Sequence, residues 1–342
     1  MNMYKWIEKM INDEEKKPLP ILSFPSVQLL YVTVKELVTS SSLQAMGMRM
    51  IADKYNMPAA LSFMDLSVEA EAFGAYTVYA ADEVPTIIGQ LVQNQAAADA
   101  LKVPSVGAGR TGINIEGVKK ALKLIGDRQV FAGCTGPFSM AGRLMNVNEV
   151  MVHCYEEPEM VHTVLRKVTD FLISYIKEFK IVGADGIVLA EPLAGLLSPQ
   201  LMQEFSTDYV KEIVDKTQDS SFIVIYHNCG NDVPRLVDQV LNTGCRVFHF
   251  GDSVNMAQLL EKMPSDCLLM GNISPSRQFK NGTPKSIRLD TIRLLESCKN
   301  HKNFIISSGC DIPPLTEFDN IDSFFETVKA FYYRQRLWDM VM

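Results

Sequence analysis

Three residues of the sequence have side chains that bind soft metal ions, and each lies where an apolar run ends. His227 ends the run FIVIYH, Cys229 follows it by two positions, and Cys310 follows the run FIISSG. Imidazole and thiolate are ligands that zinc prefers, and a catalytic zinc commonly has three protein ligands and one open position. The residue types and their number therefore favour a catalytic zinc site made of His227, Cys229 and Cys310.

The His-x-Cys pair alone is a weak signal. A buried cysteine beside a strand-end histidine that is hydrogen-bonded to backbone would give the same letters. Two features favour the metal site. Residues two apart on an extended segment point the same way, which holds for His227 and Cys229. Gly309 directly before Cys310 permits a close backbone approach.

The elements that must position these residues are short, β-rich apolar runs separated by amphipathic helical patterns. This alternation is typical of parallel β/α folds, and eight runs predict a (β/α)₈ TIM barrel, with a doubly wound sheet as the alternative. No linker divides the chain, so we expect one barrel domain over 1–342, with an additional helical extension at residues 1–19. The predicted strands are 20–25, 59–65, 129–136, 185–192, 222–228, 245–252, 267–274 and 304–311.

Barrel enzymes build their active sites at the carboxyl ends of the strands. Two acids at predicted strand ends are therefore candidates for a fourth metal ligand, Asp252 first and Glu191 second. Asp252 could equally be the N-cap of the next helix. Glu191 could be a strand-end hydrogen-bond acceptor or a partner of His227. His249 lies inside the apolar run FHF, and we interpret it as a core histidine.

Composition excludes several classes of partner. The chain of 342 residues has a formal net charge of −7 and no cluster of Lys and Arg, so nucleic acid is not an expected partner. No apolar window of about 18 residues is free of charge, so no membrane segment is expected. The seven cysteines are odd in number and widely spaced, which indicates reduced thiols. The amino terminus has no secretory pattern, and we expect a cytoplasmic protein.

Three segments make the sequence similar to a known family. YHNCGN, GNISPSRQFKNGTP and SSGCDIPPLTEFDNI resemble the uroporphyrinogen decarboxylase superfamily, specifically its methylcobalamin:thiol methyltransferase branch. That branch includes methylcobalamin:coenzyme M methyltransferases and is marked by an H-x-C…C zinc motif, which His227, Cys229 and Cys310 match. The resemblance extends roughly from residue 20 to 335.

The resemblance implies a zinc-dependent corrinoid methyltransferase. It would move a methyl group from methylcobalamin to a zinc-activated thiol, such as coenzyme M, or to another acceptor, possibly a folate. The chain has no D-x-H-x-x-G cobalamin motif, so a separate corrinoid protein is the expected partner. Asp65 occupies the position that resembles the catalytic aspartate of the decarboxylases. It and Glu191 are the candidate catalytic acids, although Asp65 could also be structural or could orient the substrate.

Two alternatives remain. A metal-free decarboxylase of the same superfamily is disfavoured, because the segment SFPSVQLLYVTVKEL after the first predicted strand has no arginine to grip a porphyrin carboxylate. Cys310 also stands where the decarboxylases have a histidine. A non-catalytic corrinoid-partner or metal-storage protein with a structural zinc would need a fourth protein ligand, and no third cysteine lies near His227 or Cys310 in the sequence.

Overall fold

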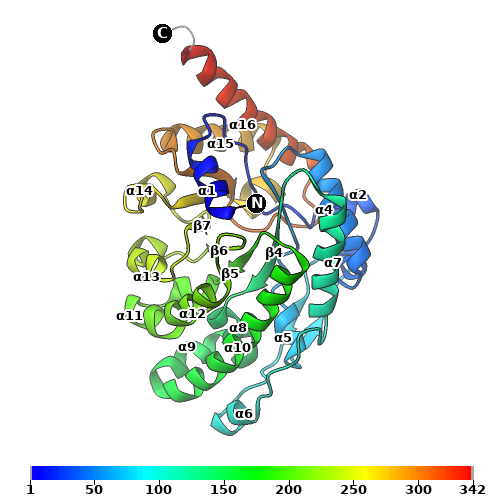
Figure 1. Cartoon of the computed structure of the whole chain (residues 1–342), viewed down its shortest axis with the longest axis vertical. Coiled ribbons are helices and arrows are strands. Elements are labelled where there is room, and N and C mark those ends of the chain that lie inside the picture. Colours follow the sequence, from blue (N-terminus) through cyan, green and yellow to red (C-terminus); the bar gives the residue numbers. More distant parts are fainter. Residues whose placement is uncertain (1, 340–342) are drawn as a thin grey trace.

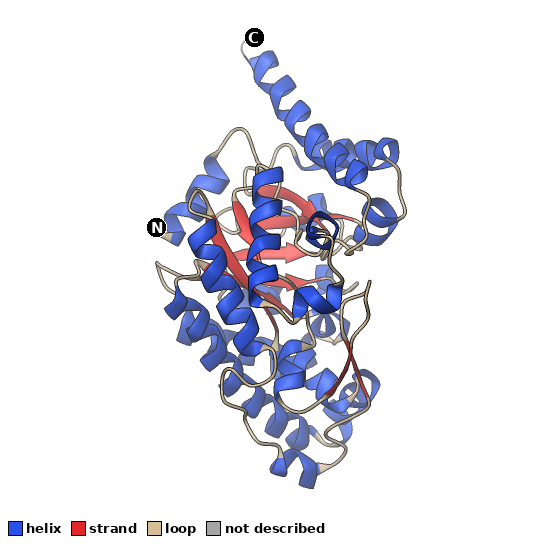
Figure 2. Ribbon diagram, turned by 90° about the vertical axis from the view of Figure 1, so that its right-hand side faces the viewer, coloured by secondary structure: helices blue, strands red, loops and turns tan. Residues whose placement is uncertain are grey.

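A curled parallel sheet lies at the centre of the computed structural model, which describes residues 2–339 (Figures 1 and 2). Within the described residues this sheet has seven strands, hydrogen-bonded in the order β1-β4-β5-β6-β7-β8-β9, and all six pairings are parallel. The strands are β1 (Ala59–Leu61), β4 (Gln129–Thr135), β5 (Gly186–Ala190), β6 (Ile223–Asn228), β7 (Val247–Phe250), β8 (Leu268–Ile273) and β9 (Phe304–Ser308).

Helices surround the sheet, as the alternation of patterns predicts (Figure 2). The α-helices are α1 (Met3–Asn12), α2 (Ser26–Leu30), α3 (Val34–Val38), α4 (Ser41–Lys54), α5 (Val68–Ala72), α6 (Gln95–Ala100), α7 (Thr111–Leu124), α8 (Pro137–Met145), α9 (Val147–Glu156), α10 (Pro158–Val182), α11 (Pro199–Met202), α12 (Asp208–Thr217), α13 (Val237–Asn242), α14 (Met256–Leu260), α15 (Pro284–Cys298) and α16 (Phe318–Asp339). Four short 3₁₀ or π turns are η1 (Pro192–Leu196), η2 (Gln203–Thr207), η3 (Val233–Arg235) and η4 (Pro275–Lys280).

The register of the sheet places the candidate ligands. All six residues of β6 are buried, which suits its run of β-branched and aromatic residues. In this register His227 lies opposite Ala190 of β5 and His249 of β7. Because parallel strands end at the same edge of a sheet, the segments that follow β6, β7 and β9 meet there.

The prediction of a strand at residues 20–25 is wrong. This segment runs beside β9 and reaches β1, but it forms no ladder: Leu19 N donates to Ile306 O at 3.1 Å, Ile21 N to Ser308 Oγ at 3.0 Å, and Ser23 Oγ to Leu61 O at 2.7 Å. Prolines stand at both ends of the segment, Pro20 and Pro25, and proline has no N–H to contribute to a ladder. Seven of the eight predicted strands are therefore present in the described residues.

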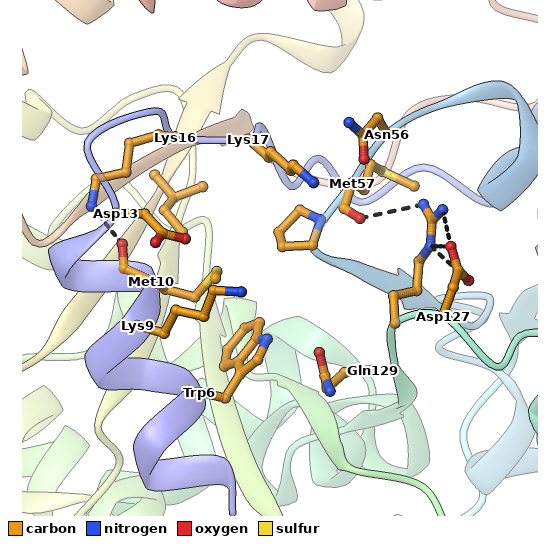
Figure 3. A pocket seen from close by; sticks show the side chains of 13 residues that line it. Trp6, Lys9, Met10, Asp13, Lys16, Lys17, Asn56, Met57, Asp127 and Gln129 are labelled. Carbon is orange, nitrogen blue, oxygen red and sulfur yellow. Dashed lines mark hydrogen bonds and ion pairs between the residues drawn. The ribbon is translucent and has the colours of Figure 1, made fainter. Parts of the chain in front are cut away.

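Helix α1 forms within the predicted amino-terminal extension and covers the amino ends of the strands. Met3, Trp6 and Ile7 are buried, and the Trp6 ring lies 5.4 Å from that of Phe131 in β4. A cavity of about 240 Å³ lies between α1 and the start of β4. Figure 3 shows Trp6 and Gln129 among its lining residues. This cavity lies at the opposite end of the sheet from His227.

A small hairpin was not predicted from the sequence. Strands β2 (Tyr76–Val78) and β3 (Thr86–Ile88) pair antiparallel, and Tyr76 and Ile88 are exposed. Among the described residues, no helix is both long enough and apolar enough to span a membrane.

Candidate metal centre

The structure brings together the three residues that the sequence predicts as metal ligands. His227 is the penultimate residue of β6, Cys229 directly follows that strand, and Cys310 lies two residues after β9. One ligand atom from each residue, the imidazole nitrogen or the Sγ, lies within 4.8 Å of the other two. His227 is buried, whereas Cys229 and Cys310 are partly exposed. The two cysteines of the group thus lie nearer the protein surface than the histidine.

The donor set and its spacing fit a zinc ion. Zinc bound at about 2.3 Å from sulfur and about 2.0 Å from nitrogen in a tetrahedron would hold its ligand atoms roughly 3.5 Å apart. Cys310 Sγ lies 3.5 Å from His227 Nε2. Three soft donors with this spacing could accept the ion with small side-chain shifts, and a fourth position would remain for another ligand.

The two thiols share a hydrogen bond, and their acidities diverge. The hydrogen bond from Cys310 lowers the pKa of Cys229. The same bond, together with burial, raises the pKa of Cys310 to about 12. Cys229 therefore forms a thiolate more readily than Cys310.

His249 lies directly behind the metal group, although the sequence interpretation left it out. Its Nδ1 is 2.8 Å from Nδ1 of His227, and its Nε2 is 2.8 Å from Ser307 Oγ. Burial, followed by the nearby His227, lowers the pKa of His249 well below its ordinary value, so its ring is neutral. The pairing register of β6 and β7 would have revealed the contact of His249 with His227, because the two residues are directly paired in these adjacent strands.

Glycine allows the loops after β6 and β7 to pack tightly beside the ligands. A Cβ added to Gly251 would lie 2.6 Å from the Cα of Cys229, which is closer than real Cβ atoms approach. Gly251 N donates a hydrogen bond to Asn228 O at 3.2 Å. Gly251 is therefore a backbone contact of Cys229, and a larger residue there would displace that ligand.

Asp252, the predicted fourth ligand, is not part of the close group. Its side chain is exposed, and it is absent from the set of ligand atoms that lie within 4.8 Å of one another. The close group among the described residues thus consists of His227, Cys229 and Cys310.

Glu191 caps a helix and makes no hydrogen bond to the ligands through its side chain. It is fully buried, and its carboxylate accepts hydrogen bonds from Phe138 N at 2.7 Å and Ser139 N at 2.9 Å, in the first turn of α8. Ser206 Oγ donates a third at 2.9 Å. Burial raises the pKa of Glu191, and these hydrogen bonds oppose that rise. The contacts match the alternative of a strand-end hydrogen-bond acceptor, held at the positive end of a helix.

Asp65 has an arginine partner that the local sequence does not reveal. Arg110, at the N-cap of α7, forms a buried ion pair with Asp65 and a second ion pair with Glu71 at 2.5 Å. Ser67 Oγ donates to Asp65 Oδ1 at 2.6 Å. Both oxygens of Asp65 are engaged, which supports the structural role that the sequence left open.

Glu69 is a buried acid that the sequence reasoning missed. Its carboxylate accepts hydrogen bonds from Thr135 N at 3.1 Å and Thr135 Oγ1 at 3.0 Å, at the end of β4. Burial raises the pKa of Glu69 to about 7. Its position in a short helix after β1 gave no signal, because acids on exposed helix faces look the same in a sequence.

Comparison with known proteins identifies the family to which the chain is similar. The model of the uroporphyrinogen decarboxylase (URO-D) family matches residues 26–331. Methylcobamide:CoM methyltransferase MtbA of Methanosarcina acetivorans is 26% identical over 274 residues, which are 79% of this chain and 78% of that protein. A uroporphyrinogen decarboxylase of Coxiella burnetii is 22% identical over 319 residues, which are 89% and 84% of the two chains.

A solved structure is similar over nearly its whole length. A methyltransferase from Methanosarcina mazei superposes with a TM-score of 0.84 at 19% identity, and the match covers 97% of this chain and 99% of that one. At this identity the likeness supports the fold alone. The matched family model spans most of the chain, and the protein therefore belongs to the uroporphyrinogen decarboxylase family.

Proposed function

We propose that this protein is a zinc-dependent methyltransferase that moves a methyl group from a corrinoid to a thiol. The observation that carries the proposal is the group of His227, Cys229 and Cys310 at the carboxyl ends of the strands, within 4.8 Å of one another. A metal-free decarboxylase has no need of two cysteines and a histidine in this arrangement. The similarity to a methylcobamide:CoM methyltransferase supports the same assignment.

The three residues would hold zinc through His227 Nε2 and the two sulfur atoms. When bound there, zinc supplies Lewis acidity that keeps an acceptor thiol deprotonated at neutral pH. The two cysteine ligands balance the charge of the ion, so the acceptor sulfur stays electron-rich. Cys229 and Cys310 are the partly exposed members of the group, so we expect the acceptor to approach from their side.

The transfer breaks one bond and forms another. The acceptor sulfur bonds to the methyl carbon, while the cobalt–carbon bond breaks and leaves its electron pair on cobalt, which passes from Co(III) to Co(I). This substitution needs sulfur, carbon and cobalt in line, and fixing that alignment is the contribution of the protein. We expect methylcobalamin to arrive on a separate corrinoid protein, and the acceptor thiol to be coenzyme M or another thiol.

The test combines metal content with methyl transfer. Purified protein should contain about one zinc per chain, and it should demethylate methylcobalamin in the presence of a suitable thiol, followed by the absorbance change of the corrinoid. Cys229→Ala and Cys310→Ala should lose both properties. Cys267→Ala is the matched control, because Cys267 precedes β8 at the amino end of the sheet, and this variant should keep both.

The decarboxylase alternative makes the opposite prediction. Wild-type protein purified without chelators and supplied with zinc would contain none, and uroporphyrinogen would lose carboxyl groups without metal. The relative from Coxiella burnetii makes this a necessary second assay. That result would replace the proposed function.

A further inference from the structure

We propose that His249 is a positioning residue that holds His227 in the tautomer protonated on Nδ1, so that Nε2 is a free ligand for the metal. The geometry behind this is a chain of hydrogen bonds from His227 through His249 and Ser307 to the carbonyl of Leu19. The inference rests on the proposed metal centre and adds a residue to it. The sequence interpretation placed His249 in the core without a role.

The contacts of His227, at one end of this series of hydrogen bonds, indicate which ring nitrogen carries the proton. Nδ1 of His227 is 2.8 Å from Nδ1 of His249 and 3.3 Å from the backbone oxygen of His249. A carbonyl oxygen only accepts hydrogen bonds. Nδ1 of His227 is therefore the donor, and in the neutral ring Nε2 then carries no proton.

The hydrogen bonds at the other end of the series, at Ser307 and Leu19, independently assign the same proton position in His227. Ser307 Oγ donates to Leu19 O at 2.7 Å, and this carbonyl too can only accept. With its proton used there, the Ser307 oxygen accepts from Nε2 of His249 at 2.8 Å. His249 then carries its proton on Nε2, and its bare Nδ1 accepts from His227.

Because all four residues of the series are buried, water does not compete for their hydrogen bonds. Leu19, His227, His249 and Ser307 are each at most 2% exposed, so water does not replace a missing partner. The His249 ring has hydrogen-bond partners in His227, Ser307 and the backbone of Ser308, and none of them is an anion that would hold a doubly protonated ring.

On the opposite side of the ring, Nε2 of His227 faces Cys310 Sγ at 3.5 Å. The lone pair of Nε2 therefore points into the metal group before any metal binds. We call this series of hydrogen bonds, from His227 through His249 and Ser307 to Leu19 O, the relay. It gives the segment before α2 a role, because the Leu19 carbonyl is the last acceptor of the relay although the segment forms no strand.

The direct test is nuclear magnetic resonance of metal-free protein labelled with ¹⁵N in histidine. The sequence has five histidines, and variants with glutamine at His153, His162 or His301 assign their signals by loss. We expect His227 to be protonated on Nδ1 and His249 on Nε2. Observation of His227 protonated on Nε2 in the folded wild type would overturn the proposal.

A second test measures zinc affinity by competition with a chromophoric chelator. His249→Leu removes the side-chain acceptor, and we expect affinity to fall about 10- to 100-fold, the usual effect of losing such a partner. His249→Gln retains a carbonyl acceptor and should recover most of that loss. His301→Gln, in the turn before β9, is the control and should bind like wild type. Equal affinities for Leu and Gln at position 249 would contradict the proposed relay.

Ser307→Ala keeps the test decisive if His249→Leu does not fold. Loss of the Ser307 acceptor frees the Nε2 proton of His249, and a fraction of His227 should then change to the Nε2-protonated tautomer. Neither readout depends on methyl transfer. An inactive enzyme with the expected tautomers would reject the proposed function alone, whereas zinc binding with the wrong tautomers would reject the relay alone.

Discussion

Gly309 lies against the backbone of Asp252, so that a Cβ at position 309 would sit 2.6 Å from Asp252 N. The two residues follow β9 and β7, and their contact sets how closely the loop that carries Cys310 approaches the sheet edge. Gly309 N also donates to Ile273 O at 2.7 Å, which fixes the loop to β8. The position of Cys310 thus depends on a residue without a side chain.

Gly309→Ala should weaken metal binding while the protein remains folded. The new methyl group must push the Cys310 loop away from Asp252, because backbone atoms cannot yield as a flexible side chain does. We expect at least a tenfold loss of zinc affinity, measured by chelator competition, with a modest loss of stability of about 1–3 kcal/mol. Gly126→Ala is the matched control, since a Cβ there meets nothing within 4 Å. Equal losses in both variants would show that the close approach at Gly309 has no special role.

The proximity of His227, Cys229 and Cys310 could be predicted from the sequence, because the position of each residue at a strand end is a local signal. A polar residue that ends an apolar run lies at a strand end, and strand ends converge in a parallel sheet. Partners that meet only through the tertiary fold gave no such signal. Arg110 is 45 positions from Asp65, and His249 shows its relation to His227 only through the register of two strands.

The absence of the predicted strand at residues 20–25 has a physical explanation in the sequence itself. The run PILSFP has the apolar character of a strand, but the prolines at its two ends have no N–H to donate to a ladder. The hairpin of β2 and β3 could not be predicted for a different reason, the length of its strands. Its strands are only three residues long, too short for alternation to be recognised.

Glu69 makes stability depend on pH in the direction opposite to that of most acids. Its pKa is raised to about 7 in the folded protein, against 4.5 ordinarily. The folded state therefore holds this proton more tightly than the unfolded chain, so the stabilisation is complete below about pH 4.5 and is lost as the pH rises through 7.

Glu69→Gln should consequently raise the free energy of unfolding at pH 8 relative to wild type, by on the order of 2 kcal/mol. The amide can still accept from Thr135 N and donate to Thr135 Oγ1. At pH 5 the difference should shrink to a fraction of this. Urea denaturation of both proteins at the two pH values gives the comparison, and a gain that is independent of pH would refute the assignment.

Asp65→Ala separates a structural acid from a catalytic one. Removal of Asp65 leaves the buried guanidinium of Arg110 with Glu71 as its remaining carboxylate, and breaking a buried ion pair costs about 3–5 kcal/mol. We expect this loss in urea denaturation, with zinc content unchanged because Asp65 is outside the metal group. The variant Asp65→Ala/Arg110→Met, which removes both charges, should be more stable than Asp65→Ala alone. Loss of zinc in the folded single variant would instead connect Asp65 to the metal centre.

Glu191→Gln tests whether the second candidate acid acts in chemistry or in folding. Its two carboxylate oxygens accept from Phe138 N and Ser139 N separately. In the glutamine variant one of these positions holds an NH₂ group, which faces a backbone donor and leaves it without an acceptor. The expected cost is about 1–3 kcal/mol in the free energy of unfolding.

Turnover per bound zinc should change less than threefold in Glu191→Gln, because no reacting atom contacts this carboxylate in the proposed reaction. Glu204→Gln is the control: Glu204 lies in the same region, but its side chain is largely exposed, so the change should leave stability nearly unaltered. A loss of turnover of a hundredfold or more in Glu191→Gln, at full zinc content and with unchanged stability, would place Glu191 among the catalytic residues. The two measurements together distinguish these roles because a cap for α8 affects unfolding, whereas a catalytic acid affects the rate.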